Sequence, residues 1–124
     1  MSFPARYLCV AIFFVSLVAH AQTAKEMDRR SFMALSATLA YELGKTYQMG
    51  QNCDKDLSSI GPARTEGLFG RYMKGKDFKQ TMIHYNKGMQ DEFYAFCDRE
   101  ELKASGAELI ARMTQYGKIA DPFR

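Results

Sequence analysis

Two residue types that build metal and redox sites are scarce in this chain of 124 residues. It contains two histidines, His20 and His84, three cysteines and no Cys-x-x-Cys pair. No Gly-Lys-Ser/Thr follows the glycines at positions 67, 70 and 75. The absences argue against a redox-active cysteine pair and a phosphate-binding loop. His84 is the one histidine beyond the N-terminal segment that we expect to be removed, which argues against a two-histidine zinc site in the remaining chain. The net charge of +3 is too small to indicate a nucleic-acid-binding protein.

The composition predicts one folded domain. Apolar residues make up 47% of the sequence and charged residues 25%, as in ordinary globular proteins. Disorder and low complexity are therefore not expected. A length of 124 residues suits a single domain with its own hydrophobic core.

The N-terminal segment has the pattern of a secretory signal peptide. The positive charge of Arg6 precedes an apolar run over residues 7–19, and Ala19 and Ala21 supply the small residues of a cleavage site. The run is shorter than the roughly 20 apolar residues that a membrane-spanning helix needs. We therefore expect residues 1–21 to be removed. Residues 22–124 then form a single helical domain that is periplasmic or secreted, with no integral membrane segment.

Removal of the signal peptide would take away Cys9 and leave Cys53 and Cys97. An even pair of cysteines in a small exported domain favours a structural disulfide. In the chain-entropy model, a disulfide that closes a loop of about 45 residues stabilises the folded protein by about 4 kcal/mol, because it restricts the unfolded chain. A redox-active or metal-binding pair is the alternative, but it would call for Cys-x-x-Cys spacing or further His and Cys ligands.

Apolar residues recur at three- and four-residue steps along nearly the whole mature chain, which predicts helices, and no useful stretch alternates as a strand would. We expect a long amphipathic helix over residues 25–49. It should end at Gly50, since glycine accepts the left-handed conformation that is common past a helix end. A short helix capped by Asp54 or Asp56 should follow.

Two further helices are expected in the middle of the sequence. Pro62 suits the first turn of a helix that extends to about Lys74 and ends at Gly75. Asp77 can cap the next helix, which carries the clearest apolar stripe of the sequence and ends near the second cysteine. That stripe consists of Phe78, Met82, Tyr85, Met89, Phe93, Phe96 and Cys97.

A capping box of Asp98 and Glu101 predicts the start of a last helix, which should end at Gly117 and Pro122. One continuous helix over residues 77–116 is the competing interpretation. In both cases the predicted fold is all-α, a small bundle of about four helices with one disulfide. The expected apolar positions of the last helix are Leu102, Leu109, Ile110, Met113 and Tyr116.

No catalytic constellation is recognised, and no cofactor or metal is expected. His84 lies next to Tyr85 on the apolar side of its helix, where a surface histidine or a hydrogen-bonded, half-buried one is the plain interpretation. The acidic residues between positions 91 and 101 are explained by a solvated face and by the preference of a helix start for acids.

Charge is unevenly distributed along the sequence. Residues 61–90 carry a net charge of +4, and residues 91–101 carry −4. A basic patch around Gly75 could receive an acidic partner, anionic lipid headgroups or a peptidoglycan-associated polymer, whereas a merely solvated surface is the alternative. The candidate partner-binding residues are Arg71, Lys74, Lys76 and Lys79.

Residues 85–89, Tyr-Asn-Lys-Gly-Met, are followed by Tyr94 and Cys97. This pattern resembles the aromatic-Asn-basic-Gly-aromatic run before a Tyr and a Cys in a family of small exported proteins of Gram-negative bacteria with no established function. Met89 stands where that family has an aromatic residue. The resemblance implies export, a helical fold and pairing of Cys53 with Cys97, and it implies no activity. Independently of it, Gly88 inside a helix suggests close backbone packing.

These observations favour a non-enzymatic periplasmic interaction or accessory protein, for example in an envelope assembly or secretion system. Its expected partner is another envelope protein. A periplasmic stress chaperone that exposes apolar surface when its carboxylates protonate is one alternative. An inhibitor or immunity protein of a secreted enzyme is another.

Overall fold

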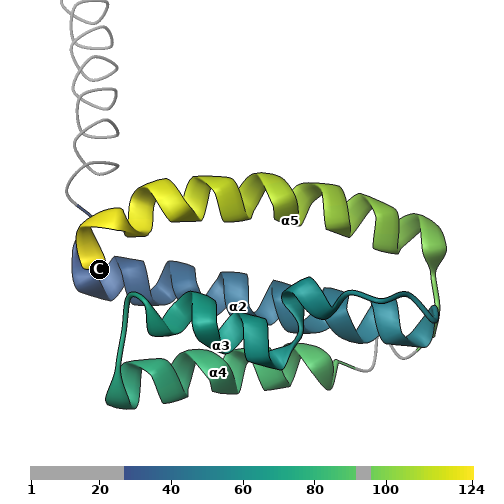
Figure 1. Ribbon diagram of the computed structural model, residues 1–124, viewed down its shortest axis with the longest axis horizontal. Coiled ribbons are helices and arrows are strands. Elements are labelled where there is room, and N and C mark those ends of the chain that lie inside the picture. The colour runs from purple at the N-terminus through teal and green to yellow at the C-terminus, as the bar shows by residue number, and fades with distance from the viewer. Residues whose placement is uncertain (1–26, 92–95) are drawn as a thin grey trace, which may run out of the picture.

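The computed structural model describes residues 27–91 and 96–124. In this part of the chain there are four α-helices, two 3-10 helices and no strand (Figure 1). The predicted all-α bundle with about four helices is confirmed. The predicted signal peptide and Phe93 of the apolar stripe lie outside the described residues. The elements are α2 (Arg29–Asn52), η1 (Ser58–Ile60), α3 (Pro62–Gly70), α4 (Gly75–Met89), α5 (Arg99–Ala120) and η3 (Asp121–Phe123).

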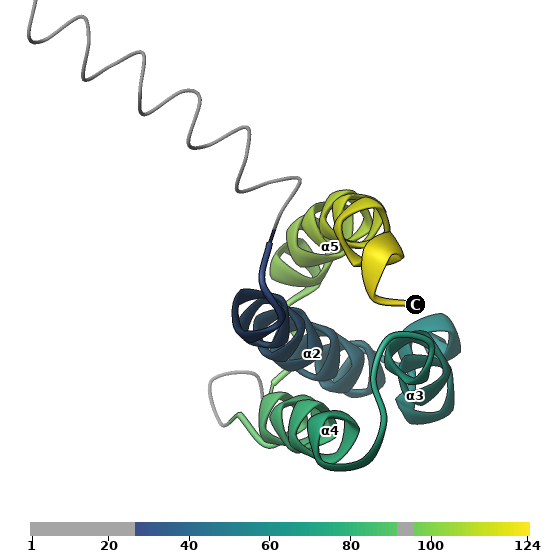
Figure 2. The same ribbon diagram turned by 90° about the vertical axis from the view of Figure 1, so that its left-hand side faces the viewer.

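Helix α2 is the centre of the bundle. It contacts each of the other three α-helices, and its contact with α4 is the most extensive. Figure 2, which looks along the helices, shows α2 between α4 on one side and α5 on the other, with α3 beside it. The side chain of Asp28 caps α2 by accepting a hydrogen bond from the backbone N–H of Ser31 at 2.7 Å.

Gly50 does not end the first helix, contrary to prediction, because α2 continues to Asn52. Gly50 is buried, and a Cβ at this position would lie 2.3 Å from Cδ1 of Leu57. The lack of a side chain at Gly50 therefore leaves room for Leu57, which packs the following loop against α2. The left-handed conformation that marks a chain reversal occurs further on, at Asp54, with a φ of 54°.

The turn between α3 and α4 also differs from the prediction. Helix α3 ends at Gly70, before the expected Lys74, and Gly75 is the first residue of α4 with a φ of 60°. The predicted cap Asp77 lies in the first turn of α4, where its carboxylate binds Arg29 (Nη2 to Oδ2, 3.0 Å), and Lys74 occupies the N-cap position.

Helix α4 ends at Met89, eight residues before the predicted end, so the continuous helix over residues 77–116 is wrong. Phe96, a member of the predicted stripe, is 83% exposed, and Cys97 lies outside any helix. Cys97 forms the predicted disulfide with Cys53, which brings their Cα atoms within 4.8 Å. Since Cys53 follows α2 directly and Cys97 lies just before α5, the bond holds the start of α5 at the C-terminal end of α2.

The start of α5 confirms the Asp98 half of the predicted capping box, because the side chain of Asp98 accepts a hydrogen bond from the N–H of Glu101 at 3.0 Å. The carboxylate of Glu101 instead accepts a hydrogen bond from the hydroxyl of Ser105 at 3.2 Å. The end of α5 lies beyond the predicted stop. Gly117 sits inside the helix, and Pro122 belongs to η3. Ile110, a predicted apolar-face residue, is 70% exposed, because the buried face of α5 is narrower than the sequence pattern indicates.

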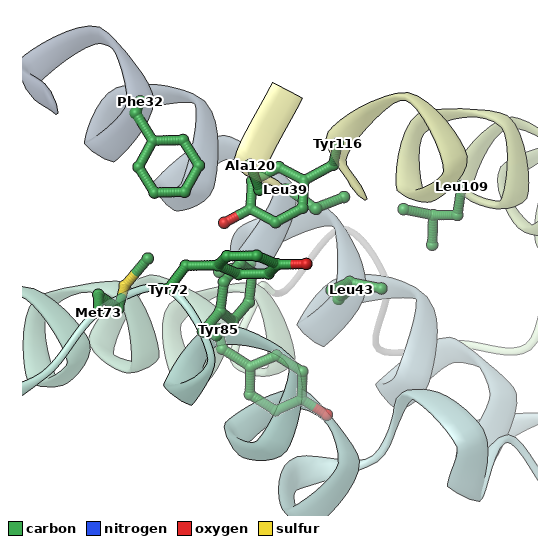
Figure 3. Close-up of a cluster of buried hydrophobic side chains, with 11 residues drawn as sticks. Phe32, Leu39, Leu43, Tyr72, Met73, Tyr85, Leu109, Tyr116 and Ala120 are labelled. Atoms are coloured by element: carbon green, nitrogen blue, oxygen red, sulfur yellow. The ribbon is translucent and has the colours of Figure 1, made fainter. Parts of the chain in front are cut away.

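Aromatic side chains from all four α-helices of the described chain and from the turn after α3 meet in the main core (Figure 3). The ring of Tyr116 stacks on Phe32 with a centroid distance of 5.6 Å, and it meets Phe69 and Tyr72 edge to face. Offset-stacked and edge-to-face pairs are the favourable arrangements of aromatic rings. Tyr116 therefore attaches the C-terminal half of α5 to α2 and to the end of α3.

Two glycines allow α2 and α4 to approach each other at backbone distance. A Cβ on Gly44 of α2 would lie 2.0 Å from the carbonyl oxygen of Tyr85, and a Cβ on Gly88 of α4 would lie 2.1 Å from that of Tyr41. Any side chain at either position would force the helices apart. The close backbone packing predicted for Gly88 is thus confirmed.

Candidate functional site

The four predicted partner-binding residues lie together where α3 ends and α4 begins. All four are exposed, and within residues 27–91 and 96–124 none of them takes part in an ion pair. We call this surface the basic corner. It consists of Arg71, the C-cap of α3, Lys74, the N-cap of α4, and Lys76 and Lys79 on α4.

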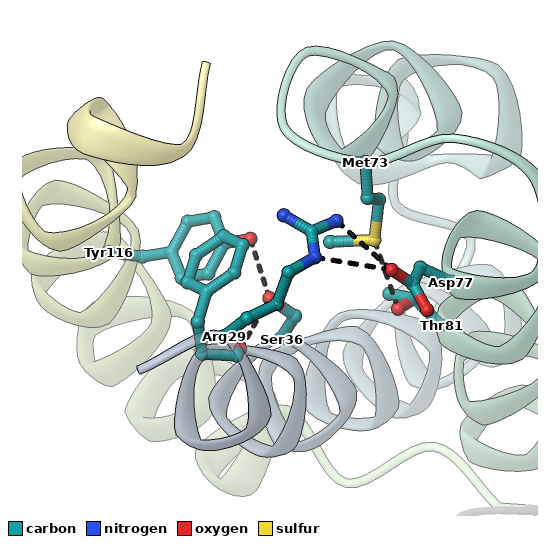
Figure 4. Close-up of polar contacts among 7 residues, drawn as sticks. Arg29, Ser36, Met73, Asp77, Thr81 and Tyr116 are labelled. Atoms are coloured by element: carbon teal, nitrogen blue, oxygen red, sulfur yellow. Dashed lines mark hydrogen bonds and ion pairs between the residues drawn. The ribbon is translucent and has the colours of Figure 1, made fainter. Parts of the chain in front are cut away.

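Buried side chains hold the basic corner in place. Tyr72 and Met73, which lie between Arg71 and Lys74, are 7% and 3% exposed and belong to the main core. The hydroxyl of Thr81 donates a hydrogen bond to the sulfur of Met73 at 3.1 Å (Figure 4). The backbone that presents the cations is therefore fixed by packing on both sides of the turn.

One carboxylate lies within the basic corner, but it is already engaged. Figure 4 shows the guanidinium of Arg29 reaching from α2 to Asp77. Its Nη2 and Nε donate to Oδ2 at 3.0 and 3.3 Å. The charge of Asp77 is thus matched by Arg29, and the corner keeps its positive character. This contact was not foreseen in the sequence, because it joins residues 48 positions apart.

A groove along the N-terminal part of α5 was not predicted from the sequence. It has a volume of about 690 Å³ and lies between α5, the loop that carries η1, and one residue of α2. We call it the α5 groove. Gly106 and Ala107, adjacent small residues within α5, were the one signal for it in the sequence. Its lining consists of Thr46, Lys55, Leu57, Ser59, Ile60, Arg99, Leu102, Lys103, Gly106, Ala107, Leu109, Ile110 and Met113.

His84 is half-buried on α4, but without, among the described residues, the hydrogen bond expected for a half-buried histidine, and it lines a small cavity of about 210 Å³ together with Met33 and Thr81. In the described part of the chain it has no hydrogen-bond or ion-pair partner, and no serine or cysteine is paired with it. Residues 27–91 and 96–124 also contain no group of three His, Cys, Asp or Glu side chains placed to hold a metal ion.

Two buried tyrosine hydroxyls carry the strongest pKa shifts of the described residues. Burial raises the pKa of Tyr85 and of Tyr116 to about 12. The hydroxyl of Tyr85 donates to the carbonyl oxygen of Ile60 at 2.8 Å, and that of Tyr116 shares a hydrogen bond with Ser36 at 2.8 Å (Figure 4). These hydrogen bonds connect α4 to the end of η1 and α5 to α2.

Alkaline conditions should therefore destabilise the protein through Tyr85 and Tyr116. Well below pH 10 both tyrosines are protonated in the folded and the unfolded chain, so their titration does not change the free energy of unfolding. Between about pH 10 and 12 the unfolded chain releases protons that the fold retains. Stability should fall by about 1.4 kcal/mol per pH unit for each tyrosine. Urea unfolding at a series of pH values measures this slope, which Tyr85→Phe with Tyr116→Phe should flatten. If stability falls as steeply with pH in that double variant, the alkaline loss of stability does not come from Tyr85 and Tyr116.

The chain matches no protein-family model, no curated protein and no solved structure. No helix within the described ranges is both long enough and apolar enough to cross a membrane. The candidate sites therefore rest on their own chemistry, the positive charge of the basic corner and the mixed apolar and cationic lining of the α5 groove.

Proposed function

We propose that this protein is a non-catalytic interaction protein of the periplasm or the cell exterior and that its basic corner binds an acidic surface on another envelope protein. The setting we propose is an envelope assembly or secretion system, in which the protein serves as an accessory factor. The Cys53–Cys97 disulfide supports an oxidising compartment, where such bonds persist.

The observation that carries the proposal is the combination of free charge and fixed backbone at the basic corner. Four cations stand exposed around the turn between α3 and α4, and two residues of that turn, Tyr72 and Met73, are buried in the core. A charged surface of one sign steers an oppositely charged partner and fixes its orientation. Because the backbone is already held in place, little ordering would be required on binding.

Affinity capture of partners from the envelope fraction, with the exported protein as bait, tests this proposal. We expect a partner with an acidic surface to be recovered by the wild type in low salt and released as salt is raised. The variant Lys74→Glu/Lys76→Glu/Lys79→Glu should recover it at a yield lower by about tenfold or more. Its circular dichroism spectrum and thermal melting should stay close to wild type, since exposed side chains contribute little to stability.

A matched control separates a specific surface from overall charge. Arg64→Glu/Lys87→Glu/Lys118→Glu changes the net charge by the same amount, but its three exposed positions are spread over α3, α4 and α5. This control should retain the partner. If the basic-corner variant folds and still recovers every partner at wild-type yield in low salt, the basic corner is only a solvated surface.

A further inference from the structure

The α5 groove has the size and the surface of a small-molecule site rather than of a flat docking face. Its volume of about 690 Å³ falls within the range of about 300 to 1,000 Å³ that is typical of ligand pockets. Most of the wall is apolar, and Gly106 and Ala107 leave room because they have little or no side chain. The apolar wall consists of Leu57, Ile60, Leu102, Leu109, Ile110 and Met113.

All charged side chains that line the α5 groove are positive. Lys55, Arg99 and Lys103 are exposed, and within the described ranges none of them is in an ion pair. Acidic residues are common in this part of the sequence, but Asp56 and Asp98 accept hydrogen bonds from the backbone N–H groups of the turns that they cap. The groove is thus complementary to an anion although its surroundings are rich in acids.

On α5 the cationic side chains of the groove wall come first, and the wall beyond them carries no charged side chain. On α5, Arg99 and Lys103 lie in the first two turns, and Ile110 and Met113 lie further along the same helix. The rise of an α-helix places Lys103 about 15 Å from Met113 along the axis. A ligand with an anionic head and an apolar tail of about this length would match both parts. Dodecanoate, a medium-chain fatty acid anion, has this shape.

One polar group is buried in the α2 wall of the groove. Thr46 lines the groove and is 1% exposed, and its hydroxyl has no hydrogen-bond partner among the described residues. A buried hydroxyl without a partner is unfavourable and is normally satisfied in a folded protein. The groove is therefore not optimised as a closed, purely apolar core.

We propose that the α5 groove binds one medium-chain fatty acid, with the carboxylate at Lys55, Arg99 and Lys103 and the acyl chain along Gly106 and Ile110 toward Met113. A pocket of this volume suits a drug-sized ligand, which favours a single acyl chain over the two chains of a phospholipid. This site is distinct from the basic corner, and the proposal does not depend on the acidic partner.

Calorimetric titration of the oxidised exported protein with dodecanoate, kept below its micelle concentration, tests this site. We expect saturable binding of one molecule per chain, whereas butyrate, which has the carboxylate but a short tail, should not bind measurably. Gly106→Leu should weaken dodecanoate binding by about tenfold or more by filling the groove. A Cβ at Gly106 meets no atom within 4 Å, so the helix should accept the new side chain.

Gly117→Leu is the matched control, because Gly117 lies on the same helix with equally open surroundings and does not line the groove. This variant should bind dodecanoate as the wild type does. If Gly106→Leu fails to fold by circular dichroism, Ala107→Leu replaces it, since Ala107 is exposed and also lines the groove.

Charge reversal tests the head-group end separately. Arg99→Glu/Lys103→Glu should weaken binding by about tenfold or more, and the basic-corner variant Lys74→Glu/Lys76→Glu/Lys79→Glu should leave it unchanged. The proposal is overturned if dodecanoate shows no saturable binding. It is also overturned if the groove-filling variant binds like the wild type, or if the basic-corner variant loses as much affinity as the groove variants. None of these results would affect capture of an acidic partner.

Discussion

Replacing Gly88 with alanine should destabilise the protein by roughly 3 kcal/mol, the upper end of the usual cost of adding a group to a packed core. The new Cβ would lie 2.1 Å from the carbonyl oxygen of Tyr41, which belongs to the backbone of α2 and cannot rotate away. Helices α2 and α4 would have to separate along the most extensive contact of the bundle. The gain in helix propensity, about 1 kcal/mol for glycine to alanine, is too small to compensate.

Urea unfolding followed by circular dichroism measures this loss. Gly106→Ala and Gly117→Ala provide matched controls, because both glycines are helical and a Cβ at either meets no atom within 4 Å. These two variants should be as stable as the wild type or more stable by up to about 1 kcal/mol. A Gly88→Ala protein as stable as these controls would show that α2 and α4 do not approach at backbone distance.

Removing the disulfide should have an effect of similar size. Cys97→Ser should cost about 2 to 4 kcal/mol, since the bridge closes a long loop and restricts the unfolded chain. Cys97 is the better position to replace because it is exposed, whereas a serine in place of the buried Cys53 would add the cost of burying a hydroxyl. For a domain of this size the melting temperature should fall by about 10 °C or more.

Scanning calorimetry with and without a reductant checks the same bond in the wild type. Reduced wild-type protein should melt close to the Cys97→Ser variant, and the variant itself should not respond to the reductant. Two titratable thiols in protein purified without reductant, or a variant that melts like the oxidised wild type, would contradict the assigned role of the disulfide.

Features encoded in short segments could be predicted from the sequence. The helical periodicity and the Asp98 cap with Glu101 depend on residues within a few positions of one another. Gly88 was recognised because a glycine interrupts a helical pattern, although the backbone that it contacts, at Tyr41, belongs to α2. The disulfide was predicted because the expected mature chain offered two cysteines and therefore one pairing. Such features can be predicted because they depend on the local helix geometry or on the number of cysteines in the chain.

Features set by contacts between distant segments could not be predicted in this way. The apolar pattern of α4 runs on to Phe96, yet the helix ends at Met89 and Phe96 is 83% exposed. Gly50 was taken as a helix stop, although its lack of a side chain serves contact with Leu57. For the same reason the α5 groove was missed, since its walls come from three separate segments of the chain.

The basic corner is tested most directly by amide NMR of the oxidised, isotope-labelled chain from residue 22 to 124, the expected mature form, as the captured partner is added. The amide signals of residues 71–79 should shift first and most, and the shifts should diminish as salt is raised. Signals along α5 from Arg99 to Met113 should stay in place, because that groove is a separate site. Shifts confined to α5 or another face, with residues 71–79 unchanged, would contradict the assignment of the basic corner as the binding surface.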